Sequence, residues 1–411
     1  MVVERGPASF HVMAKPRGPV CNLECAYCYY RSKEHLYPGS KFRMSDEVLE
    51  QYISQYIAAQ AVPQVIFAWQ GGEPTLMGLD FFRRAVRLQD KHGRPGMRIH
   101  NALQTNGTTF NKDWCLFLAD HGFLVGLSLD GPQHVHDTYR RDRRGRPSFD
   151  RVMEGLNSLR RYRVEFNILA CVHAANVGQP IEVYRFLRDE VGARFIQFIP
   201  VVEQRLESVS VLSTTREAEP NEMVTERSVN GQAWGHFLMS VFDEWVRHDV
   251  GQVFVQIFDA ALARWLGAPA GLCVFEETCG LALVLEHNGD LYSCDHFVAP
   301  QHRLGNIMDA SLAALVASPQ QREFGRAKRN ALPMDCLQCD VRFACNGGCP
   351  KDRVARTAMG EPGLNYLCEG YGAFFRYIGP AMEWMALLVR QGRQPAEIME
   401  VLATGTNGVC T

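Results

Sequence analysis

Between residues 65 and 200, short apolar runs alternate with longer amphipathic segments. The short runs predict strands, and the longer segments, whose apolar residues recur at helical spacing, predict helices. The expected strands are 65–69, 99–104, 124–129, 164–172 and 195–200, and the expected helices are 80–91, 112–120, 149–161 and 181–190. Such alternation is typical of parallel strand–helix units, so we expect an α/β fold built on a parallel sheet.

Loops with glycine and polar residues follow three of these strands, at 71–74, 104–107 and 128–132. In folds made of parallel units, functional sites lie in the loops at the carboxyl ends of the strands. The three loops are therefore consistent with one shared pocket. Upstream, Ser45 followed by two acidic residues predicts the start of a helix that extends towards Ala59.

The rest of the chain is less regular. Residues 203–230 form a polar stretch, and residues 231–247 predict one further amphipathic helix. Beyond Gly271 the cysteines occur in bursts and secondary structure is hard to predict, so we expect a second domain to begin near there.

Composition and charge narrow the class of protein. Apolar residues make up 46% and charged residues 21% of the chain, which is ordinary globular usage. A net charge of -2 gives no reason to expect nucleic acid or an acidic membrane as the main partner, and most of the basic run at 140–144 is expected to be solvated loop. The longest apolar stretch, 374–389, is interrupted by Arg376, Pro380 and Glu383, and no secretion signal is recognisable. We therefore expect a cytoplasmic protein.

Fourteen cysteines are a large number for such a protein. Because cytosolic thiols are kept reduced, these cysteines indicate a metal site or catalysis rather than disulfides. Cys21, Cys25 and Cys28 form a CxxxCxxC loop. Three thiolates can hold three irons of a 4Fe–4S cluster and leave the fourth iron open to another ligand. A zinc site is the alternative, with His11 or His35 as the fourth ligand.

CxxxCxxC with an aromatic residue, Tyr27, before its last cysteine resembles the signature of the radical S-adenosylmethionine (SAM) superfamily. The Gly-Gly-Glu-Pro segment at 71–74 resembles that superfamily's second motif, in which the backbone at Gly72 meets the methionine amino group. The resemblance also places SAM contacts at Tyr27, at Ser128 and Arg140, for the methionine and ribose portions, and at Ile196, for the adenine. It implies a partial (β/α)6 TIM-type barrel. In that superfamily a reduced cluster cleaves SAM, and the 5′-deoxyadenosyl radical abstracts hydrogen from a substrate.

The C-terminal region carries a second group of cysteines. The run Cys336-x2-Cys339-x5-Cys345-x3-Cys349 could by itself be a zinc ribbon. Beside the N-terminal motif it resembles the SPASM extension, an irregular cysteine-rich domain with two auxiliary 4Fe–4S clusters. The resemblance assigns Cys273, Cys279, Cys294 and Cys349 to the nearer cluster, and Cys336, Cys339, Cys345 and Cys368 to the farther one. With four ligands each, neither cluster leaves an iron open, so electron transfer is their expected role.

Six segments resemble the anaerobic sulfatase-maturating enzymes: 21–30, 69–76, 104–107, 128–132, 195–198 and 293–297. That family oxidises one cysteine or serine of a sulfatase to Cα-formylglycine, releasing 5′-deoxyadenosine and methionine. The resemblance covers residues 10–375 and implies an unfolded Cys/Ser-x-Pro-x-Arg segment as substrate and a flavodoxin- or ferredoxin-type electron donor. We expect a monomer with a radical SAM domain (1–235), a SPASM domain (236–375) and a C-terminal helical segment (376–411).

Asp295, next to the cluster ligand Cys294, matches the family's proposed base, which removes the side-chain proton of the target residue. Without the motif, a lone aspartate on a loop would be expected to be solvated. Tyr30 is a further candidate for the same pocket, although an aromatic residue there is more often a packing residue. Three cysteines stay unassigned: Cys115 and Cys171, expected to be small buried apolar residues, and Cys410.

Two other classes of function stay open from the sequence. One is a SPASM maturase that forms thioether or carbon–carbon crosslinks in a small peptide. An N-terminal leader-binding domain would favour that class, and we expect none, since 20 residues precede Cys21. The other is a non-catalytic zinc-binding interaction module, which iron with labile sulfide would exclude.

Overall fold

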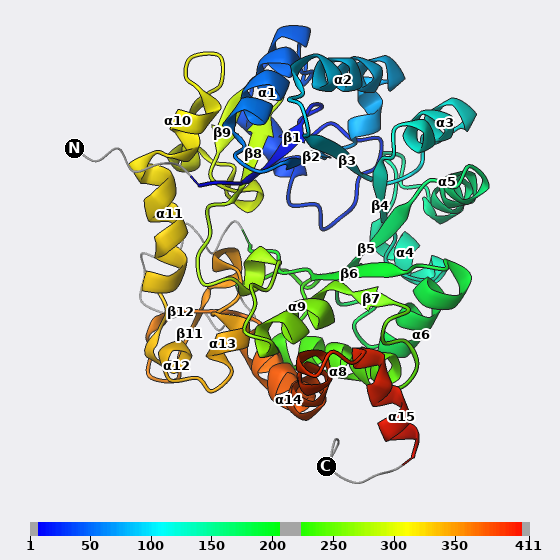
Figure 1. Cartoon of the computed structure of the whole chain (residues 1–411), viewed down its shortest axis with the longest axis vertical. Helices are drawn as coiled ribbons and strands as arrows, with labels where there is room; N and C mark the ends of the chain where they lie inside the picture. Colours follow the sequence, from blue (N-terminus) through cyan, green and yellow to red (C-terminus); the bar gives the residue numbers. More distant parts are fainter. Residues whose placement is uncertain (1–6, 206–222, 405–411) are drawn as a thin grey trace. The chain divides into compact units, whose positions relative to one another are not determined.

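The structure is a computed structural model that describes residues 7–205 and 223–404 (Figure 1). The chain is organised as two compact units, each made of separate segments. Unit 1 contains the described residues of 1–128, 139–166 and 278–327. Unit 2 contains those of 129–138, 167–277 and 328–411.

Unit 1 is built on a sheet with the strand order β10-β9-β8-β1-β2-β3-β4. The strands are β1 (His11–Lys15), β2 (Gln64–Trp69), β3 (Arg98–Thr105), β4 (Leu124–Ser128), β8 (Ala282–Glu286), β9 (Asp290–Tyr292) and β10 (Arg303–Asn306). From β8 to β4 the neighbours are parallel, whereas β8, β9 and β10 pair antiparallel. The parallel order places the carboxyl ends of β1 to β4 at one edge of this sheet.

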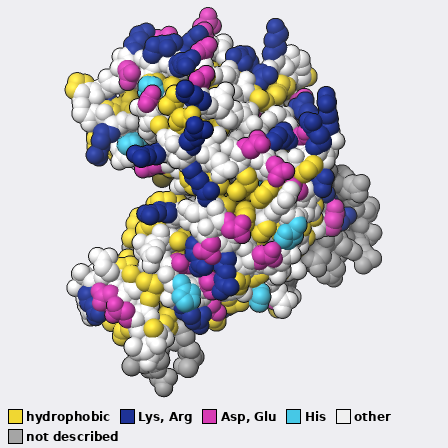
Figure 2. Space-filling model, turned by 90° about the vertical axis from the view of Figure 1, so that its right-hand side faces the viewer, with side chains coloured by type: hydrophobic (Ala, Val, Ile, Leu, Met, Phe, Trp, Pro, Cys, Tyr) yellow, Lys and Arg dark blue, Asp and Glu magenta, His cyan; other side chains and the backbone are white. Residues whose placement is uncertain are grey.

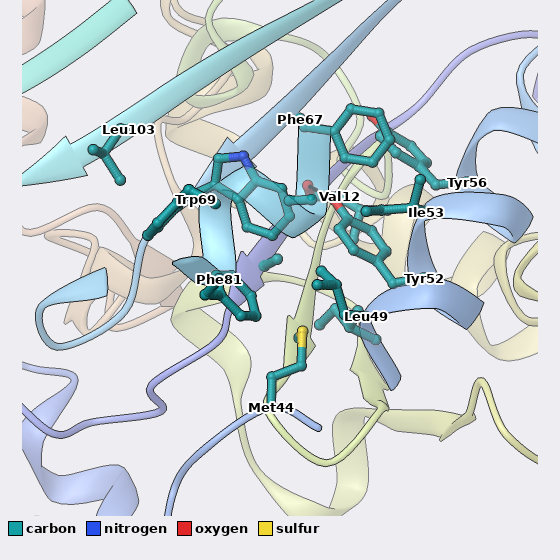
Figure 3. Close-up of a cluster of buried hydrophobic side chains, with 14 of the residues drawn as sticks. Val12, Met44, Leu49, Tyr52, Ile53, Tyr56, Phe67, Trp69, Phe81 and Leu103 are labelled. Carbon is teal, nitrogen blue, oxygen red and sulfur yellow. Dashed lines mark hydrogen bonds between the residues drawn. The ribbon is translucent and has the colours of Figure 1, made fainter. Parts of the chain in front are cut away.

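Helices cover the sheet of unit 1: α1 (Asp46–Ala59), α2 (Leu79–His92), α3 (Lys112–Asp120), α5 (Phe149–Arg161) and α10 (Leu312–Val316). The start of α1 is fixed by Ser45, whose hydroxyl oxygen accepts a hydrogen bond from the backbone N–H of Val48 (3.2 Å). Figure 3 shows how residues of α1 and α2 pack against alternate residues of β2, of which Phe67 and Trp69 are fully buried. Burying side chains of this size contributes roughly 1.5–3 kcal/mol each to stability.

Unit 2 has the parallel strands β5 (Phe166–Val172), β6 (Phe195–Pro200) and β7 (Phe254–Val255), and a hairpin of β11 (Ala355–Arg356) and β12 (Pro362–Leu364). Its helices are α4 (Gln133–Tyr139), α6 (Pro180–Arg185), α8 (Gly231–His248), α9 (Gln256–Trp265), α12 (Met334–Leu337), α13 (Arg342–Cys345), α14 (Cys368–Arg390) and α15 (Ile398–Ala403). Another helix, α11 (Pro319–Asn330), begins in unit 1 and ends in unit 2.

Helices α8 and α14 approach each other at their backbones. A Cβ atom on Gly370 would lie 2.0 Å from the carbonyl oxygen of Gly231, and one on Gly235 would lie 2.8 Å from the Cα of Gly370. Only glycine fits at positions 235 and 370, because a side chain at either would separate the two helices. The start of α14, which carries Cys368, is therefore closely seated on α8.

The predicted α/β fold with a parallel sheet, a cysteine-rich region and C-terminal helices is confirmed, and so are the predicted strands and helices between 65 and 200. One difference is that the helix expected at 181–190 is α6 followed by a π-helical turn, Phe186–Glu190. The helix after Ser45 and the one after Asn230 are present, while much of the expected polar loop at 203–230 lies outside the described residues. The sequence did not predict β1 or α9, nor the strands β8 to β10, and the expected C-terminal helical segment (376–411) includes only the later part of α14.

Two observations concern the surface. In the described part of the chain, no helix combines the length and the apolar character needed to cross a membrane. Figure 2 shows basic and acidic side chains interspersed over the visible face, in keeping with the net charge of -2.

Candidate active site

Three cysteines lie in the 21–28 loop, which follows the carboxyl end of β1 and is held on one side by the loop after β2. The backbone N–H of Gly72 donates to the carbonyl of Gly18 (2.7 Å), and that of Glu73 donates to the carbonyl of Val20 (2.9 Å). A Cβ atom at position 72 would lie 2.2 Å from the Val20 oxygen, so only glycine permits this approach. The Gly-Gly-Glu-Pro motif is thus in direct contact with the segment that precedes Cys21.

On its other side the 21–28 loop pairs with residues 139–142. The N–H of Glu24 donates to the carbonyl of Arg141 (2.7 Å), and the N–H of Ala26 donates to that of Tyr139 (2.9 Å). Backbone hydrogen bonds therefore hold the loop on both sides. The positions of its cysteines depend mainly on the main chain of the neighbouring segments.

Tyr27 and Arg140, both expected to contact SAM, lie together at this second side. Both are buried, and the guanidinium carbon of Arg140 is 5.5 Å from the centroid of the Tyr27 ring. A cation above an aromatic face is attracted by the ring quadrupole, so each side chain orients the other. The remaining arginines of the basic run are exposed, as expected.

The carboxylate of Glu73 has a structural role. It is fully buried and accepts hydrogen bonds from the backbone N–H and the hydroxyl of Thr75 (3.1 and 2.6 Å), the hydroxyl of Thr105 (2.8 Å) and the N–H of Asn106 (2.8 Å). These contacts join the loops after β2 and β3. Since the carboxylate is occupied by four donors, a ligand at this motif would meet backbone groups, as the resemblance implies for Gly72.

The half-buried Cys21 thiol lies in a polar environment that suits an iron ligand. The backbone N–H of Leu23 donates to its sulfur (3.3 Å), and the side-chain amide of Asn106 lies 3.6 Å away. Burial, together with the nearby charge of Glu73, raises the pKa of Cys21 to about 12. A thiol of this kind becomes a thiolate at neutral pH only when a cation such as iron stabilises it. Cys21 and Cys25 are half-buried and Cys28 is exposed, so a bound cluster could be reached from the surface.

Ser128 lies at the carboxyl end of β4, beside the end of β3. The side-chain amide of Gln104 donates to its hydroxyl oxygen (3.0 Å). A Cβ atom on Gly126 would be 2.1 Å from the Gln104 side-chain oxygen, so this glycine provides the space for the contact. Ile196, the expected adenine contact, is a buried residue of β6 in unit 2.

Asp295 begins a short turn after β9 and is paired with a buried lysine. The ammonium of Lys15, at the end of β1, lies 2.6 Å from one carboxylate oxygen of Asp295 and 2.9 Å from the side-chain oxygen of Gln70. The hydroxyl of Tyr29 donates to the second carboxylate oxygen. Burial raises the pKa of Asp295, but the positive charges of Lys15 and His296 and the hydrogen bonds from Lys15 and Tyr29 together outweigh burial and hold that pKa below its ordinary value. The carboxylate is therefore ionised at neutral pH.

Sequence reasoning missed Lys15, Tyr29 and Gln70. Lys15 is 1% exposed at the end of β1, and because the sequence did not predict that strand, no local pattern indicated a buried lysine there. Tyr30 lies under Lys15, whose nitrogen is 4.5 Å from the ring centroid, and its hydroxyl donates to the fully buried Glu286. Tyr30 thus packs beneath Lys15 and holds it in place.

Four of the C-terminal cysteines lie together in unit 2: Cys336, Cys339, Cys345 and Cys368. They come from α12, the turn after it, the end of α13 and the start of α14. Burial, together with the charges of the neighbouring cysteines, raises the pKa of Cys345 to about 12 and that of Cys368 to about 11. Four mutually close thiols of this kind match the donor set of an iron–sulfur cluster.

The other expected set is divided between the units. Cys273 and Cys349 belong to unit 2, where burial, Asp352 and Cys273 all raise the pKa of Cys349, to about 12. Cys279 and Cys294 belong to unit 1.

The three cysteines that were not assigned to a cluster differ in burial. Cys115 is fully buried as expected, whereas Cys171 is only half-buried, and Cys410 lies outside the described residues.

Among the residues that the structure describes, no three or more His, Cys, Asp or Glu side chains converge as ligands of a single metal ion would. A 4Fe–4S cluster takes one thiolate on each iron, and its ligands are therefore spread more widely than those of one ion.

Comparison with known proteins defines the class. Residues 16–187 match the model of the radical SAM superfamily, and residues 274–340 match that of an iron–sulfur cluster-binding domain, SPASM. The fold and the cysteine sets thus belong to a radical SAM protein with a SPASM domain.

Three individual relatives narrow this class. The chain is 46% identical to the serine-type anaerobic sulfatase-maturating enzyme of Bacteroides thetaiotaomicron, over 96% of each chain. It is 33% identical to the cysteine-type enzyme of Clostridium perfringens, over 90% of this chain and 96% of that one. A solved structure of native anSMEcpe with bound AdoMet and a peptide superimposes with a TM-score of 0.81 at 32% identity, covering 92% of this chain and 99% of the other. The chain belongs to the family of anaerobic sulfatase-maturating enzymes.

Proposed function

We propose that this protein oxidises a side chain of a sulfatase to Cα-formylglycine, with serine as the preferred target. Family membership supports the reaction, and the higher identity to the serine-type relative than to the cysteine-type relative supports the preference. The observation in the site that carries the proposal is Asp295, an ionised and partly buried carboxylate next to Cys294 in the sequence. The alternative, a maturase that crosslinks a small peptide, is not favoured by these relatives.

We propose that Cys21, Cys25 and Cys28 hold one 4Fe–4S cluster and that the two C-terminal sets hold two more. When bound, these clusters and SAM supply the radical that removes a hydrogen atom from the target Cβ, and they accept the electron that remains. The chain itself positions the reactants. SAM is bound by the backbone at Gly72 and by Tyr27, Ser128, Arg140 and Ile196.

Asp295 acts as the general base in this proposal. It takes the hydroxyl proton of a serine substrate, or the thiol proton of a cysteine substrate, as the Cβ hydrogen atom is lost. The losses of one hydrogen atom, one proton and one electron together convert CH₂OH to CHO. For cysteine they give a thioaldehyde, which water converts to the aldehyde with release of hydrogen sulfide. Lys15 and Tyr29 hold the carboxylate in place, and Lys15 keeps it charged.

The remaining assignments follow from the family resemblance. Residues 1–235 carry the radical SAM function, residues 236–375 the auxiliary clusters, and residues 376–411 a helical segment. Both α8 and α14 are continuous across these borders, so the ranges mark shares of function rather than separately folding parts. A flavodoxin- or ferredoxin-type protein supplies the electron, the enzyme acts as a monomer in the cytoplasm, and its substrate is an unfolded Cys/Ser-x-Pro-x-Arg segment.

Anaerobic reconstitution with matched peptides tests the function. Two peptides that differ only in a Ser or a Cys at the target position are incubated with the enzyme, SAM and a reductant, and the products are analysed by mass spectrometry. Conversion to formylglycine lowers the mass by about 2 Da for serine and about 18 Da for cysteine, and faster turnover is expected for serine. An alanine peptide should give no aldehyde. A product that keeps its sulfur in a crosslink would overturn the proposal, and equal rates would overturn only the serine preference.

A further inference from the structure

Lys328, near the end of α11, is a buried lysine aimed at one short loop. Its side chain is 1% exposed. Its ammonium donates to the carbonyl oxygens of Cys273 (2.7 Å), Val274 (2.9 Å) and Glu276. An ammonium has three N–H donors, and here they meet three carbonyls of the loop that carries Cys273.

A second cation connects Lys328 to the other cysteine loop of unit 2. Arg353 donates to the carbonyl of Lys328 (2.6 Å) and also to the carbonyls of Asn346 and Gly347 (both 3.1 Å), which lie between Cys345 and Cys349 in the sequence. The side chain of Asn346 closes the connection by donating to the carbonyl of Phe275 (2.8 Å). Lys328 and Arg353 therefore tie the 273–276 loop to the 345–349 segment within unit 2.

A buried ammonium is costly to desolvate, and an apolar side chain of similar length would fill the same space without that cost. Its charge must therefore be considered as well as its contacts. The ammonium lies 2.7 Å from the carbonyl oxygen of Cys273, so its positive charge is close to this cluster ligand. A positive charge near a cluster ligand stabilises the more negative, reduced form of the cluster, which makes its reduction potential more positive.

We infer that Lys328 is a positioning residue for the auxiliary cluster bound through Cys273: it holds the 273–276 loop in its ligating conformation and makes that cluster a better electron acceptor. This inference rests on the auxiliary cluster of the proposed function. Oxidation of the target residue leaves one electron, and a more positive potential at this cluster favours its removal.

Three variants separate the roles of charge and contact. Lys328→Met keeps the length and removes the charge, Lys328→Gln keeps two N–H donors without the charge, and Lys328→Arg keeps the charge. Arg329→Met is the matched control, because Arg329 is the next residue of α11 but is exposed and pairs with Glu277 (3.5 Å). Each variant is reconstituted, its fold is checked by circular dichroism, and iron and labile sulfide are counted. The midpoint potentials are then measured by redox titration with electron paramagnetic resonance.

The inference expects one auxiliary midpoint to move to a more negative potential in Lys328→Gln and Lys328→Met, and to return towards the wild-type value in Lys328→Arg. Loss of about four irons in Lys328→Met, with SAM cleavage retained, supports the positioning role. The ratio of formylglycine to 5′-deoxyadenosine should fall severalfold in the neutral variants. Arg329→Met should match the wild type in all of these measurements.

Unchanged potentials and iron content in both neutral variants would overturn the inference, and so would equal changes in Arg329→Met. If Lys328→Met does not fold, the midpoint potential of the auxiliary cluster in Lys328→Gln tests the inference alone. Failure of the proposed function would look different, because the wild-type protein itself would then hold about four irons or make no formylglycine.

Discussion

In unit 1, three cysteines lie within the eight residues of the 21–28 loop, whereas in unit 2 the set from Cys336 to Cys368 is spread over the short helices α12 and α13, the turn between them and the start of α14. Backbone hydrogen bonds from the loops of a parallel sheet fix the first set. The buried Lys328 and the half-buried Arg353 fix the 273–276 loop and the 345–349 segment of unit 2 through their side chains. The first arrangement should thus be sensitive to added volume at glycines, and the second to loss of polar side chains.

Removal of the cysteines in unit 1 is expected to have the largest effect. Replacing Cys21, Cys25 and Cys28 together by Ala should lower the iron content from about twelve to about eight per chain and abolish SAM cleavage. Iron and sulfide analysis with an assay for 5′-deoxyadenosine measures both. Zinc without labile sulfide in the wild-type protein would contradict the cluster assignment for both regions.

The Asp295→Asn variant is expected to have the second-largest effect. It keeps the shape of the side chain and removes the charge that faces Lys15. A general base typically contributes 10²–10⁴-fold, so formylglycine formation should fall by about that factor. Production of 5′-deoxyadenosine should fall much less, because hydrogen abstraction does not need the base.

The control for that variant is its cluster content, which should equal that of the wild type. Formylglycine formation near the wild-type rate would show that the base is another residue. Loss of a cluster would instead assign Asp295 a structural role.

Gly72→Ala tests the backbone-held loop directly. The added Cβ would lie 2.2 Å from the Val20 oxygen, and relief of such a contact typically costs about 1–3 kcal/mol. We expect SAM cleavage to fall roughly tenfold or more as the 21–28 loop moves. The matched control is Gly178→Ala, since a Cβ at position 178 would meet nothing within 4 Å. Similar activity in the two variants would mean that the loop is not fixed by this contact.

Arg353→Met tests the region held by side chains and should have the smallest effect. It removes the donors to the carbonyls of Lys328, Asn346 and Gly347, and loss of buried hydrogen bonds to a charged group costs about 1.5–3 kcal/mol. SAM cleavage should be close to normal, while formylglycine formation falls severalfold and auxiliary iron is lost more readily to a chelator. If Arg353→Met lost more SAM cleavage than Gly72→Ala, the expected difference between the backbone-held loop of unit 1 and the side-chain-held segments of unit 2 would be contradicted.

The same contrast explains what could be predicted from the sequence. Between 65 and 200 the period of apolar residues follows the buried faces of strands and helices, so these elements could be predicted with their approximate ends. The strand β1 was missed because its five residues lack a helical unit before them and pair with β8, some 270 residues later in the chain. No local sequence pattern indicates that two strands so far apart in the chain will pair.

At the candidate site, the cysteines and Asp295 could be selected because they stand in motifs. Lys15 and Lys328 could not, since a lysine in a sequence is normally solvated, and only the fold shows which lysines are buried. Cys171 was expected to be buried because small thiols usually are, yet its place near the end of β5 leaves it half-buried.

The glycine contact between α8 and α14 has a consequence for electron tunnelling. Cys368 is the first residue of α14, two residues before Gly370, whose backbone touches that of α8. Tunnelling rates fall exponentially with the distance between redox centres, so a small shift of a ligand-bearing helix changes the rate by a large factor. Larger residues at positions 235 or 370 would therefore alter the kinetics of electron transfer before they unfold the protein.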